Sequence, residues 1–236
     1  MEGIRVFYDG TDIPRFADLP GVQGFTTNCS FMRAGGHTNY AKFYAEVGPH
    51  LHGRPLSLQC WEEGLEAMML QARQVCSLGS KVFAKIPVTN SQGQSNVGAV
   101  ISLLAEGLSI NVTAVFTMQQ LRELHLALSS LPGPRAPVVV SIFCGRIDDT
   151  GVDPLPLAAA AVQLFSDIPE AEILWAGCKS VVAAVHAAKA GCQIVTVPGD
   201  ILTRMHSRRH KDLLEFSVET AQMFRDDALA GELRVS

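Results

Sequence analysis

The stretch Lys81-Val82-Phe83-Ala84-Lys85-Ile86-Pro87-Val88-Thr89 is short, apolar and partly β-branched, and the turn-forming run Thr89-Asn90-Ser91-Gln92-Gly93 follows it. This pattern predicts a buried strand that ends in a loop. Lys85 stands out, because burying an unpaired ammonium group costs several kcal/mol or forces the amine to lose its proton. A neutral amine attacks carbonyl carbon and forms a Schiff base. The alternative is an edge-strand lysine whose ammonium group reaches solvent.

Further β-rich apolar runs accompany the Lys85 strand along the chain. The predicted strands are Val6–Asp9, Gly24–Asn28, Leu56–Cys60, Val82–Val88, Ile110–Phe116, Val138–Phe143, Ile173–Gly177 and Ile194–Pro198. The predicted helices are Tyr40–Val47, Glu63–Ser77, Val97–Glu106, Met118–Leu128, Pro156–Phe165, Ser180–Ala190 and a last one from about Lys211 to Leu229.

Strands that alternate with helices in this way predict a (β/α)₈ barrel, with residues 1–236 as one domain. The competing fold is an open doubly wound sheet. That fold ordinarily carries a Gly-rich G-x-G-x-x-G turn after an early strand, and this sequence has none.

Composition narrows the classes of protein to consider. Hydrophobic residues make up 47% of the 236 residues and charged residues 18%, which is enough to bury a sizeable core. The net charge of −4 gives no reason to expect nucleic acid, and the basic patch from Arg204 to Lys211 is interpreted as a solvated loop or a local anion-binding rim. No apolar stretch predicts a membrane span or a signal peptide.

The six cysteines are scattered, without a C-x-x-C pair, and this spacing predicts neither a zinc site nor a disulfide framework. We therefore expect a reducing, cytoplasmic setting.

Polar residues stand near the C-terminal ends of seven of the predicted strands, where the active sites of such barrels lie. In chain order they are Asp9, Thr26 with Thr27 and Asn28, Gln59, Lys85, Asn111 with Thr113, Arg146 just beyond Phe143, and Lys179 just beyond Gly177. Core positions rarely hold so many polar groups without specific partners.

This set matches Schiff-base aldol chemistry. Lys85 forms the imine with a ketose, a carboxylate moves protons, amides and hydroxyls bind sugar hydroxyls, and an arginine at the rim binds phosphate. Simpler readings exist for single residues. Asp9 can cap the turn that follows it, Asn28 can be a turn residue, and Arg146 can pair with Asp148 or Asp149.

The chain resembles the transaldolases, in particular the short type related to fructose-6-phosphate aldolase. The resemblance runs almost end to end, and four motifs carry it: Gly24-Phe25-Thr26-Thr27-Asn28, Val82–Thr89, Ile110-Asn111-Val112-Thr113-Ala114 and Gly145-Arg146-Ile147-Asp148. It implies a (β/α)₈ barrel with a class I aldol mechanism that needs no metal and no cofactor.

The resemblance also implies residue roles. Lys85 would form the imine, Asp9 would transfer protons, and Asn28 would hold the intermediate. Asn111 and Thr113 would line the site, and Arg146 would bind the substrate phosphate.

Three strand ends depart from one or other branch of the family. Gln59 is typical of the aldolase branch, because transaldolases have a glutamate there that orients a water together with a threonine such as Thr113. Phe143 is typical of the transaldolase branch, where aldolases have a tyrosine. At the seventh strand, Gly177-Cys178-Lys179 replaces a Ser-x-Arg that helps to bind phosphate, so a weaker or relocated phosphate site is expected.

We therefore expect a transaldolase that acts on sugar phosphates, in central pentose phosphate metabolism or in a pathway that builds longer sugars. The alternatives are an aldolase that releases free dihydroxyacetone and a barrel that binds sugar phosphates without catalysis. Cys29, where the family usually has proline, is interpreted as structural. Relatives form rings in which the last helix packs on a neighbour, which implies a homo-oligomer, for instance a decamer.

Overall fold

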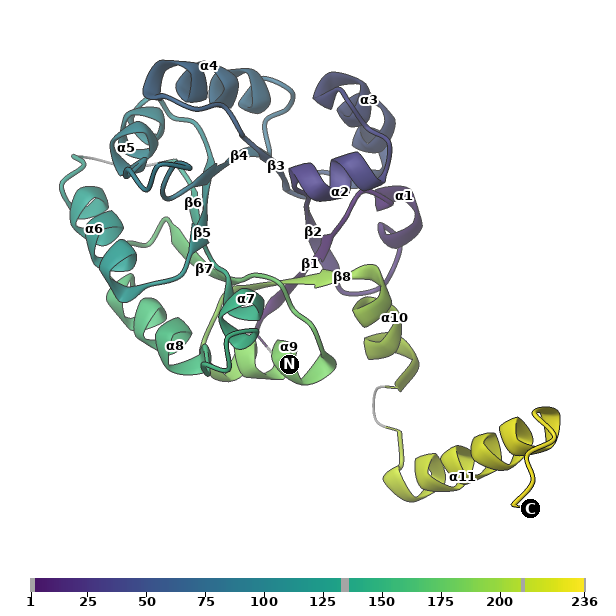
Figure 1. Ribbon diagram of the computed structural model, residues 1–236. Coiled ribbons are helices and arrows are strands. Elements are labelled where there is room, and N and C mark those ends of the chain that lie inside the picture. The colour runs from purple at the N-terminus through teal and green to yellow at the C-terminus, as the bar shows by residue number, and fades with distance from the viewer. Residues whose placement is uncertain (1–2, 133–135, 209–210, 236) are drawn as a thin grey trace. The chain divides into compact units, whose positions relative to one another are not determined.

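The protein forms a closed barrel of parallel strands, seen end-on in the computed structural model of Figure 1. The structure describes residues 3–132, 136–208 and 211–235. Within this part of the chain the strands are β1 (Arg5–Asp9), β2 (Val22–Thr26), β3 (Leu56–Gln59), β4 (Val82–Pro87), β5 (Ile110–Val115), β6 (Val138–Ile142), β7 (Ala171–Trp175) and β8 (Ile194–Pro198). Each pairs with the next and β8 closes on β1, so the predicted (β/α)₈ fold is confirmed.

The strand register pairs several of the predicted polar residues of neighbouring strands with one another. Lys85 on β4 lies opposite Gln59 on β3 and opposite Asn111 on β5, and Asp9 on β1 lies opposite Thr26 on β2. Paired residues of neighbouring parallel strands point to the same face of the sheet. The register therefore places one set of polar side chains on the inner face, near the C-terminal strand ends.

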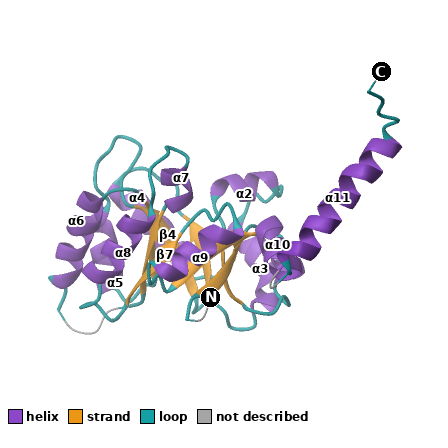
Figure 2. Ribbon diagram, turned by 90° about the horizontal axis from the view of Figure 1, so that it is seen from below, coloured by secondary structure: helices purple, strands orange, loops and turns teal. Residues whose placement is uncertain are grey.

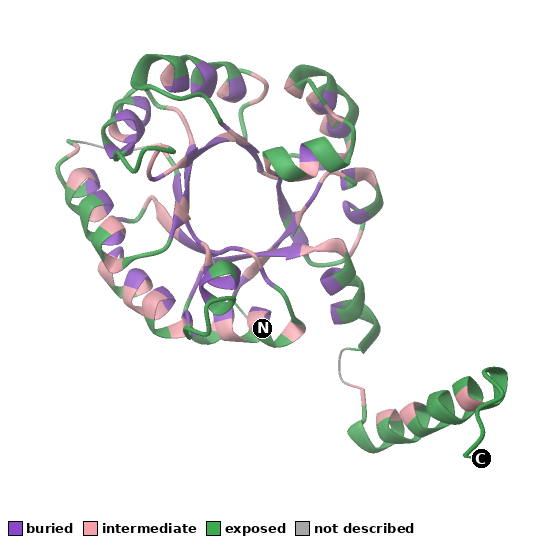
Figure 3. Cartoon of the chain, viewed as in Figure 1, coloured by how far each residue is buried: buried purple, intermediate pink, exposed green. Residues whose placement is uncertain are grey.

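Helices follow the strands and cover the outside of the barrel in the first compact unit, residues 1–202. The predicted ones there are confirmed with shifted ends, as α3 (Tyr40–Leu51), α4 (Leu65–Cys76), α5 (Val97–Ala105), α6 (Met118–Ser129), α8 (Leu155–Leu164) and α9 (Val181–Lys189). The last predicted helix is confirmed as α11 (Leu213–Ala230), in the second unit. Figure 3 shows buried residues on the strands and on the helix faces turned toward them, as an amphipathic helix requires.

The described chain also holds helices that were not predicted: α1 (Ile13–Phe16), α2 (Cys29–Ala34), α7 (Cys144–Asp148) and α10 (Gly199–Arg208). The first three are too short to show a helical period. Figure 2 shows α2 and α7 at the same end of the barrel. The loop interpretation of Arg204 to Lys211 is wrong as far as Arg208, because α10 runs through it; residues 209 and 210 lie outside the described residues.

The chain divides into two compact units, Met1–Leu202 and Thr203–Ser236. In the second unit, Asp212 caps α11 by accepting a hydrogen bond from the Glu215 N–H at 2.9 Å. Large apolar side chains of α11 are exposed: Leu213, Leu214, Val218, Met223, Phe224 and Leu229. Among the described helices, none has both the length and the apolar character to cross a membrane. That residues 1–236 act as one domain stays a prediction.

Candidate active site

Lys85 is buried at the inner wall of the barrel, with 5% of the residue exposed. Its Nζ donates to the Thr27 carbonyl oxygen at 3.5 Å and lies 5.9 Å from the centre of the Phe143 ring. Burial lowers the pKa of Lys85, while the Asp9 carboxylate opposes that shift. A lowered pKa gives the amine a larger neutral fraction near neutral pH, which is the form that attacks a carbonyl.

Asp9, on β1, lines the same cavity in the barrel as Lys85. Its Oδ1 accepts a hydrogen bond from the hydroxyl of Thr26, on the neighbouring strand β2, at 2.7 Å. Burial raises the pKa of Asp9, and Lys85 and Thr26 each oppose the rise. A carboxyl group with a raised pKa exchanges protons closer to neutral pH, as a general acid or base must.

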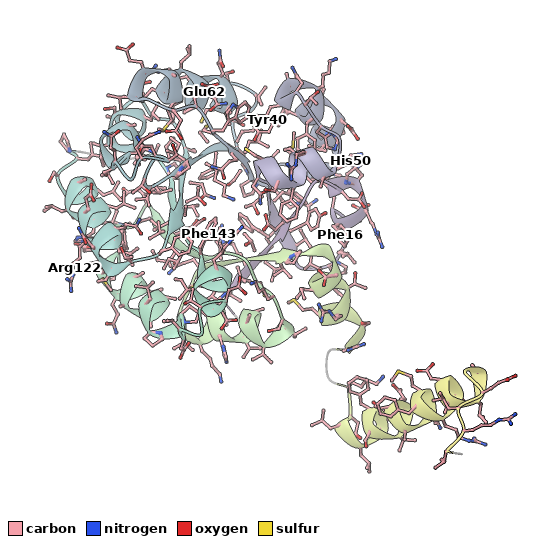
Figure 4. The ribbon with its side chains drawn as sticks, viewed as in Figure 1. Phe16, Tyr40, His50, Glu62, Arg122 and Phe143 are labelled. Carbon is pink, nitrogen blue, oxygen red and sulfur yellow. The ribbon has the colours of Figure 1, made fainter. Side chains whose placement is uncertain are left out.

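The Lys85 cavity, about 190 Å³ in volume, opens among the strand ends. Seven of the predicted site residues line it: Asp9, Thr26, Asn28, Lys85, Phe143, Arg146 and Gly177. Five further residues line it that were not predicted: Phe31, Ser141, Leu174, Ala176 and Thr196. Figure 4 shows Phe143 within the ring of strands. The cavity therefore brings an amine, a carboxylate and a guanidinium group around one space.

A buried hydrogen-bond network links three strands beside the cavity. Asn111 donates through Nδ2 to the Ser57 hydroxyl at 3.1 Å and accepts through Oδ1 from the Ser141 hydroxyl at 2.7 Å. Ser141 also lines the cavity. Asn111 itself is fully buried and does not line the cavity, so it holds Ser141 rather than facing a ligand.

Thr113 lies next to an irregularity in β5. The register with β6 shifts between Val112 and Val115, and Ala114 adopts a left-handed conformation with φ of 55°. Such bulges re-aim neighbouring side chains. The buried Thr113 and Thr27 hydroxyls have no hydrogen-bond partner within the described residues, and neither residue lines the Lys85 cavity.

Gln59 does not join the Lys85 cavity. Its Nε2 donates to the Lys85 carbonyl oxygen at 3.2 Å and to the Cys60 carbonyl oxygen at 3.0 Å. The side chain lines a neighbouring cleft instead. The structure thus separates Gln59 from the space in which Asp9 and Lys85 meet.

Arg146 and Lys179 differ in their surroundings. Arg146, on α7, lines the Lys85 cavity, and no ion pair within the described residues joins it to Asp148 or Asp149. Asp149 pairs with Lys179, which does not line the cavity. Gly177 does line it, with φ of 76°. Arg146 is thus the one guanidinium group among the described residues that line the cavity.

Asn28 has two roles at the start of α2. It lines the Lys85 cavity, and its Oδ1 accepts a hydrogen bond from the Phe31 N–H at 3.0 Å, which caps the helix. Asn28 therefore caps a helix and lines the cavity, and its role in holding an intermediate stays a prediction. The next residue, Cys29, is exposed, and desolvation by its neighbours raises the pKa of its thiol. This thiol is therefore less ionised than an ordinary cysteine.

Two of the five unpredicted lining residues could have been found from the sequence. Ser141 stands two residues before Phe143, so the period of a strand places both on one face. Thr196 is the single hydroxyl in β8, and its Oγ1 accepts from the Gly177 N–H at 3.3 Å. Phe31 depends on α2, a helix too short to predict. Among the described residues no group of His, Cys, Asp or Glu side chains is arranged to hold a metal ion. The metal-free mechanism stays a prediction.

Comparisons with known proteins support the barrel fold and one protein family. The solved structures establish the fold alone: a mandelate oxidase with benzoyl-formic acid has a TM-score of 0.54 at 13% identity, over 82% of this chain and 60% of that chain. A putative orotidine-monophosphate decarboxylase from Toxoplasma gondii gives 0.54 at 12% identity, over 85% and 81%.

Sequence relatives are more specific. A probable transaldolase of Methanococcus maripaludis strain C7 is 31% identical over 86% of this chain and 89% of its own. A probable transaldolase of Bdellovibrio bacteriovorus is 30% identical over 95% and 97%. The model of the family described as Transaldolase/Fructose-6-phosphate aldolase matches residues 6–233. This chain therefore belongs to the transaldolase/fructose-6-phosphate aldolase family.

Proposed function

We propose that this protein is a transaldolase, which moves a dihydroxyacetone unit from a ketose phosphate to an aldose phosphate through a Schiff base on Lys85. The observation that carries the proposal is the shared cavity of Lys85, Asp9 and Arg146. It supplies an amine with a lowered pKa, a carboxyl group with a raised pKa and a phosphate ligand within one space.

The first half of the reaction cleaves the donor. The neutral Lys85 amine attacks the C2 carbonyl carbon of the ketose, and loss of water gives the iminium ion. Asp9 removes the proton from the C4 hydroxyl, the C3–C4 bond breaks, and its electron pair passes to the iminium nitrogen. The aldehyde leaves, and the three-carbon unit stays on Lys85 as an enamine. Asn28 and Ser141 bind its hydroxyls.

The second half reverses these steps with another aldehyde. Arg146 binds the phosphate of the acceptor and brings its carbonyl carbon to the enamine. The new C–C bond forms, the aldehyde oxygen takes the proton from Asp9, and hydrolysis of the imine frees the product. Transfer requires that the enamine meets an aldehyde before it is protonated.

Phe143 supports transfer over simple cleavage. Its ring lies beside the Lys85 Nζ and against Phe116, with the two ring centres 5.6 Å apart. A phenylalanine presents no hydroxyl that can support protonation of the enamine. Gln59 is the feature that favours the aldolase alternative. Its amide is directed to backbone carbonyls outside the Lys85 cavity, so we weight Phe143 more heavily.

The deciding experiment supplies fructose 6-phosphate with and without an acceptor such as erythrose 4-phosphate. We expect glyceraldehyde 3-phosphate at turnover rates only when the acceptor is present. In Phe143→Tyr, release of free dihydroxyacetone should rise several-fold relative to transfer; Phe116→Tyr is the matched control. Turnover of fructose 6-phosphate alone by the unaltered protein would favour the aldolase instead.

A second proposal concerns assembly. The exposed apolar side chains of α11 support a homo-oligomer in which this helix packs on another copy of the chain. Light scattering at micromolar concentration should give a multiple of the 25.4 kDa chain mass. Replacing Leu214, Val218 and Phe224 together by serine should lower that mass. A monomeric mass for the unaltered protein would refute this proposal.

A further inference from the structure

Trp61 is a large aromatic residue on the surface of the barrel mouth. It lies two residues beyond the end of β3, and 56% of it is exposed. A tryptophan ring is large and apolar, so covering it removes much apolar surface from water. An exposed tryptophan is therefore a candidate contact for a ligand. The Lys85 cavity does not explain why this ring is exposed, because Trp61 does not line that cavity.

The surroundings of Trp61 hold it in place. The backbone N–H groups of Trp61 and Glu62 both donate to Oε1 of Gln71 on α4, at 2.8 and 3.0 Å. The indole packs edge-on against Tyr40, with ring centres 5.4 Å apart. Tyr40 in turn donates from its hydroxyl to the Gln59 carbonyl oxygen at 2.7 Å. The aromatic wall is thus built in advance of any ligand.

A cleft of about 290 Å³ lies against Trp61, while Tyr40 supports the indole from outside the cleft lining. The lining of this Trp61 cleft includes Cys29, Gln59, Trp61, Glu62, Glu63 and Ser91. Two of its lining residues are neighbours of residues that line the Lys85 cavity. Cys29 follows Asn28 of that cavity, and Gln59 is the register partner of Lys85. Figure 4 shows Tyr40 and Glu62 on the α3 and α4 side, away from Phe143.

The charges of the two spaces differ. The Lys85 cavity contains Arg146 and Lys85, whereas no lysine, arginine or histidine is among the described residues that line the Trp61 cleft. The cleft instead presents carboxylates at Glu62 and Glu63, together with amides and hydroxyls. An anionic group is repelled there, and an uncharged group that donates hydrogen bonds is accommodated.

We propose that the Trp61 cleft is a subsite for an uncharged, hydroxyl-bearing carbon chain that belongs to a substrate reacting at Lys85. The C–H face of the chain packs on the indole of Trp61. Its hydroxyls donate to the Glu62 carboxylate and to Oε1 of Gln59, which accepts no hydrogen bond from the described residues. The inference rests on the proposed function and adds the substrate class: sugars with an unphosphorylated polyhydroxy segment near the reacting carbons.

Binding is tested first without catalysis. The chain has two tryptophans, and Trp175 is 2% exposed, so Trp61 dominates any quenching by an added ligand. D-Arabinitol, which has no carbonyl and forms no imine, should quench the fluorescence saturably, while inorganic phosphate should not. Absence of saturable quenching by arabinitol, or equal quenching by phosphate, would overturn the subsite. This readout does not depend on the proposed function.

Kinetics then tests the connection to Lys85. In Trp61→Ala, kcat/KM for the unphosphorylated acceptor D-erythrose should fall about fivefold, the scale of one aromatic contact, and Trp61→Phe should keep most of it. Glycolaldehyde, too short to reach the cleft, should lose less than about twofold. Leu65→Ala, an exposed apolar residue outside the cleft, is the matched control.

An equal loss with both acceptors, or none with D-erythrose, would overturn the connection to Lys85. A different failure would refute the proposed function. If borohydride reduction of the unaltered protein with dihydroxyacetone leaves no adduct on Lys85, no Schiff base forms on that residue. The proposed function is then refuted, whatever the fluorescence shows.

Discussion

The Lys85 cavity and the Trp61 cleft both lie at the C-terminal ends of the strands, yet they take their lining from different parts of the chain. The cavity takes most of its lining from the strands and the residues that directly follow them, and it holds cationic groups. The cleft takes much of its lining from the loops after β3 and β4, and within its described lining it holds no cationic group. The comparison suggests that rigid strands supply the chemistry, while neighbouring loops select which substrates reach it.

The largest expected effect is at Lys85. Lys85→Met removes the imine nitrogen, so activity should fall on the order of 10⁴-fold or more. Lys81→Met, at an exposed lysine just before β4, should leave activity unchanged. Borohydride trapping followed by peptide mass spectrometry checks both variants. An adduct on a different lysine in the Lys85 variant would contradict the role assigned to the cavity.

Asp9→Asn should give the next largest loss, about 10²- to 10⁴-fold in kcat, because the amide cannot exchange the proton that cleavage requires. Asp12→Asn is the control, since Asp12 is exposed and does not line the cavity. Steady-state kinetics with a saturating donor gives the comparison. Retention of normal kcat in the Asp9 variant would assign proton transfer to another group.

Arg146→Gln should raise KM for a phosphorylated acceptor by about ten- to a hundredfold, the scale of a charge-assisted hydrogen bond. Glycolaldehyde, which has no phosphate, should be little affected. Lys179→Gln should change KM by no more than about twofold, because Lys179 pairs with Asp149 at the surface. Equal effects of the two variants would place the phosphate at the rim between them.

A smaller effect is expected on stability. Asn111→Ala leaves the Ser57 and Ser141 hydroxyls without their partner, which should lower the free energy of unfolding by about 1 to 3 kcal/mol. Ser91→Ala, at an exposed position of the Trp61 cleft, should lie within about 0.5 kcal/mol of the unaltered protein. Urea unfolding measures both, and equal costs would show that cavity and cleft contribute alike to stability.

The last expected effect is on pH dependence. The negative charge of Asp9 stabilises the Lys85 ammonium and so holds the pKa of Lys85 higher than burial alone would. Asp9→Asn removes that charge, the pKa of Lys85 falls further, and more neutral amine remains at low pH. The acid limb of Lys85 labelling by an amine-reactive electrophile should therefore move to lower pH. A shift to higher pH would contradict the coupling.

Sequence reasoning predicted the barrel and most of the Lys85 cavity because both depend on local patterns. Apolar runs with a period of two define strands, and a lysine inside such a run is conspicuous. Four residues expected in the site do not line the cavity: Gln59, Asn111, Thr113 and Lys179. Gln59 turns to backbone carbonyls, Asn111 to two serine hydroxyls and Lys179 to Asp149, and no sequence pattern specifies such tertiary choices.

The Trp61 cleft was not predicted at all. It depends on Gln71 reaching back from α4 to the loop after β3, and on Tyr40 of α3 packing against that loop. These contacts join residues that are ten or more positions apart. Loops of this kind leave no periodic signal, so the cleft becomes visible only in three dimensions.

The close approach of the segments that follow β6 and β7 has a consequence for protein engineering. A methyl group on Gly145 would lie 1.8 Å from the Gly177 carbonyl oxygen, and Gly177 has φ of 76°, which a serine adopts only with strain. A serine at position 177 would therefore require a change in the backbone as well as in the side chain. Engineers who wish to add a serine hydroxyl at this strand end must remodel the segment rather than one side chain.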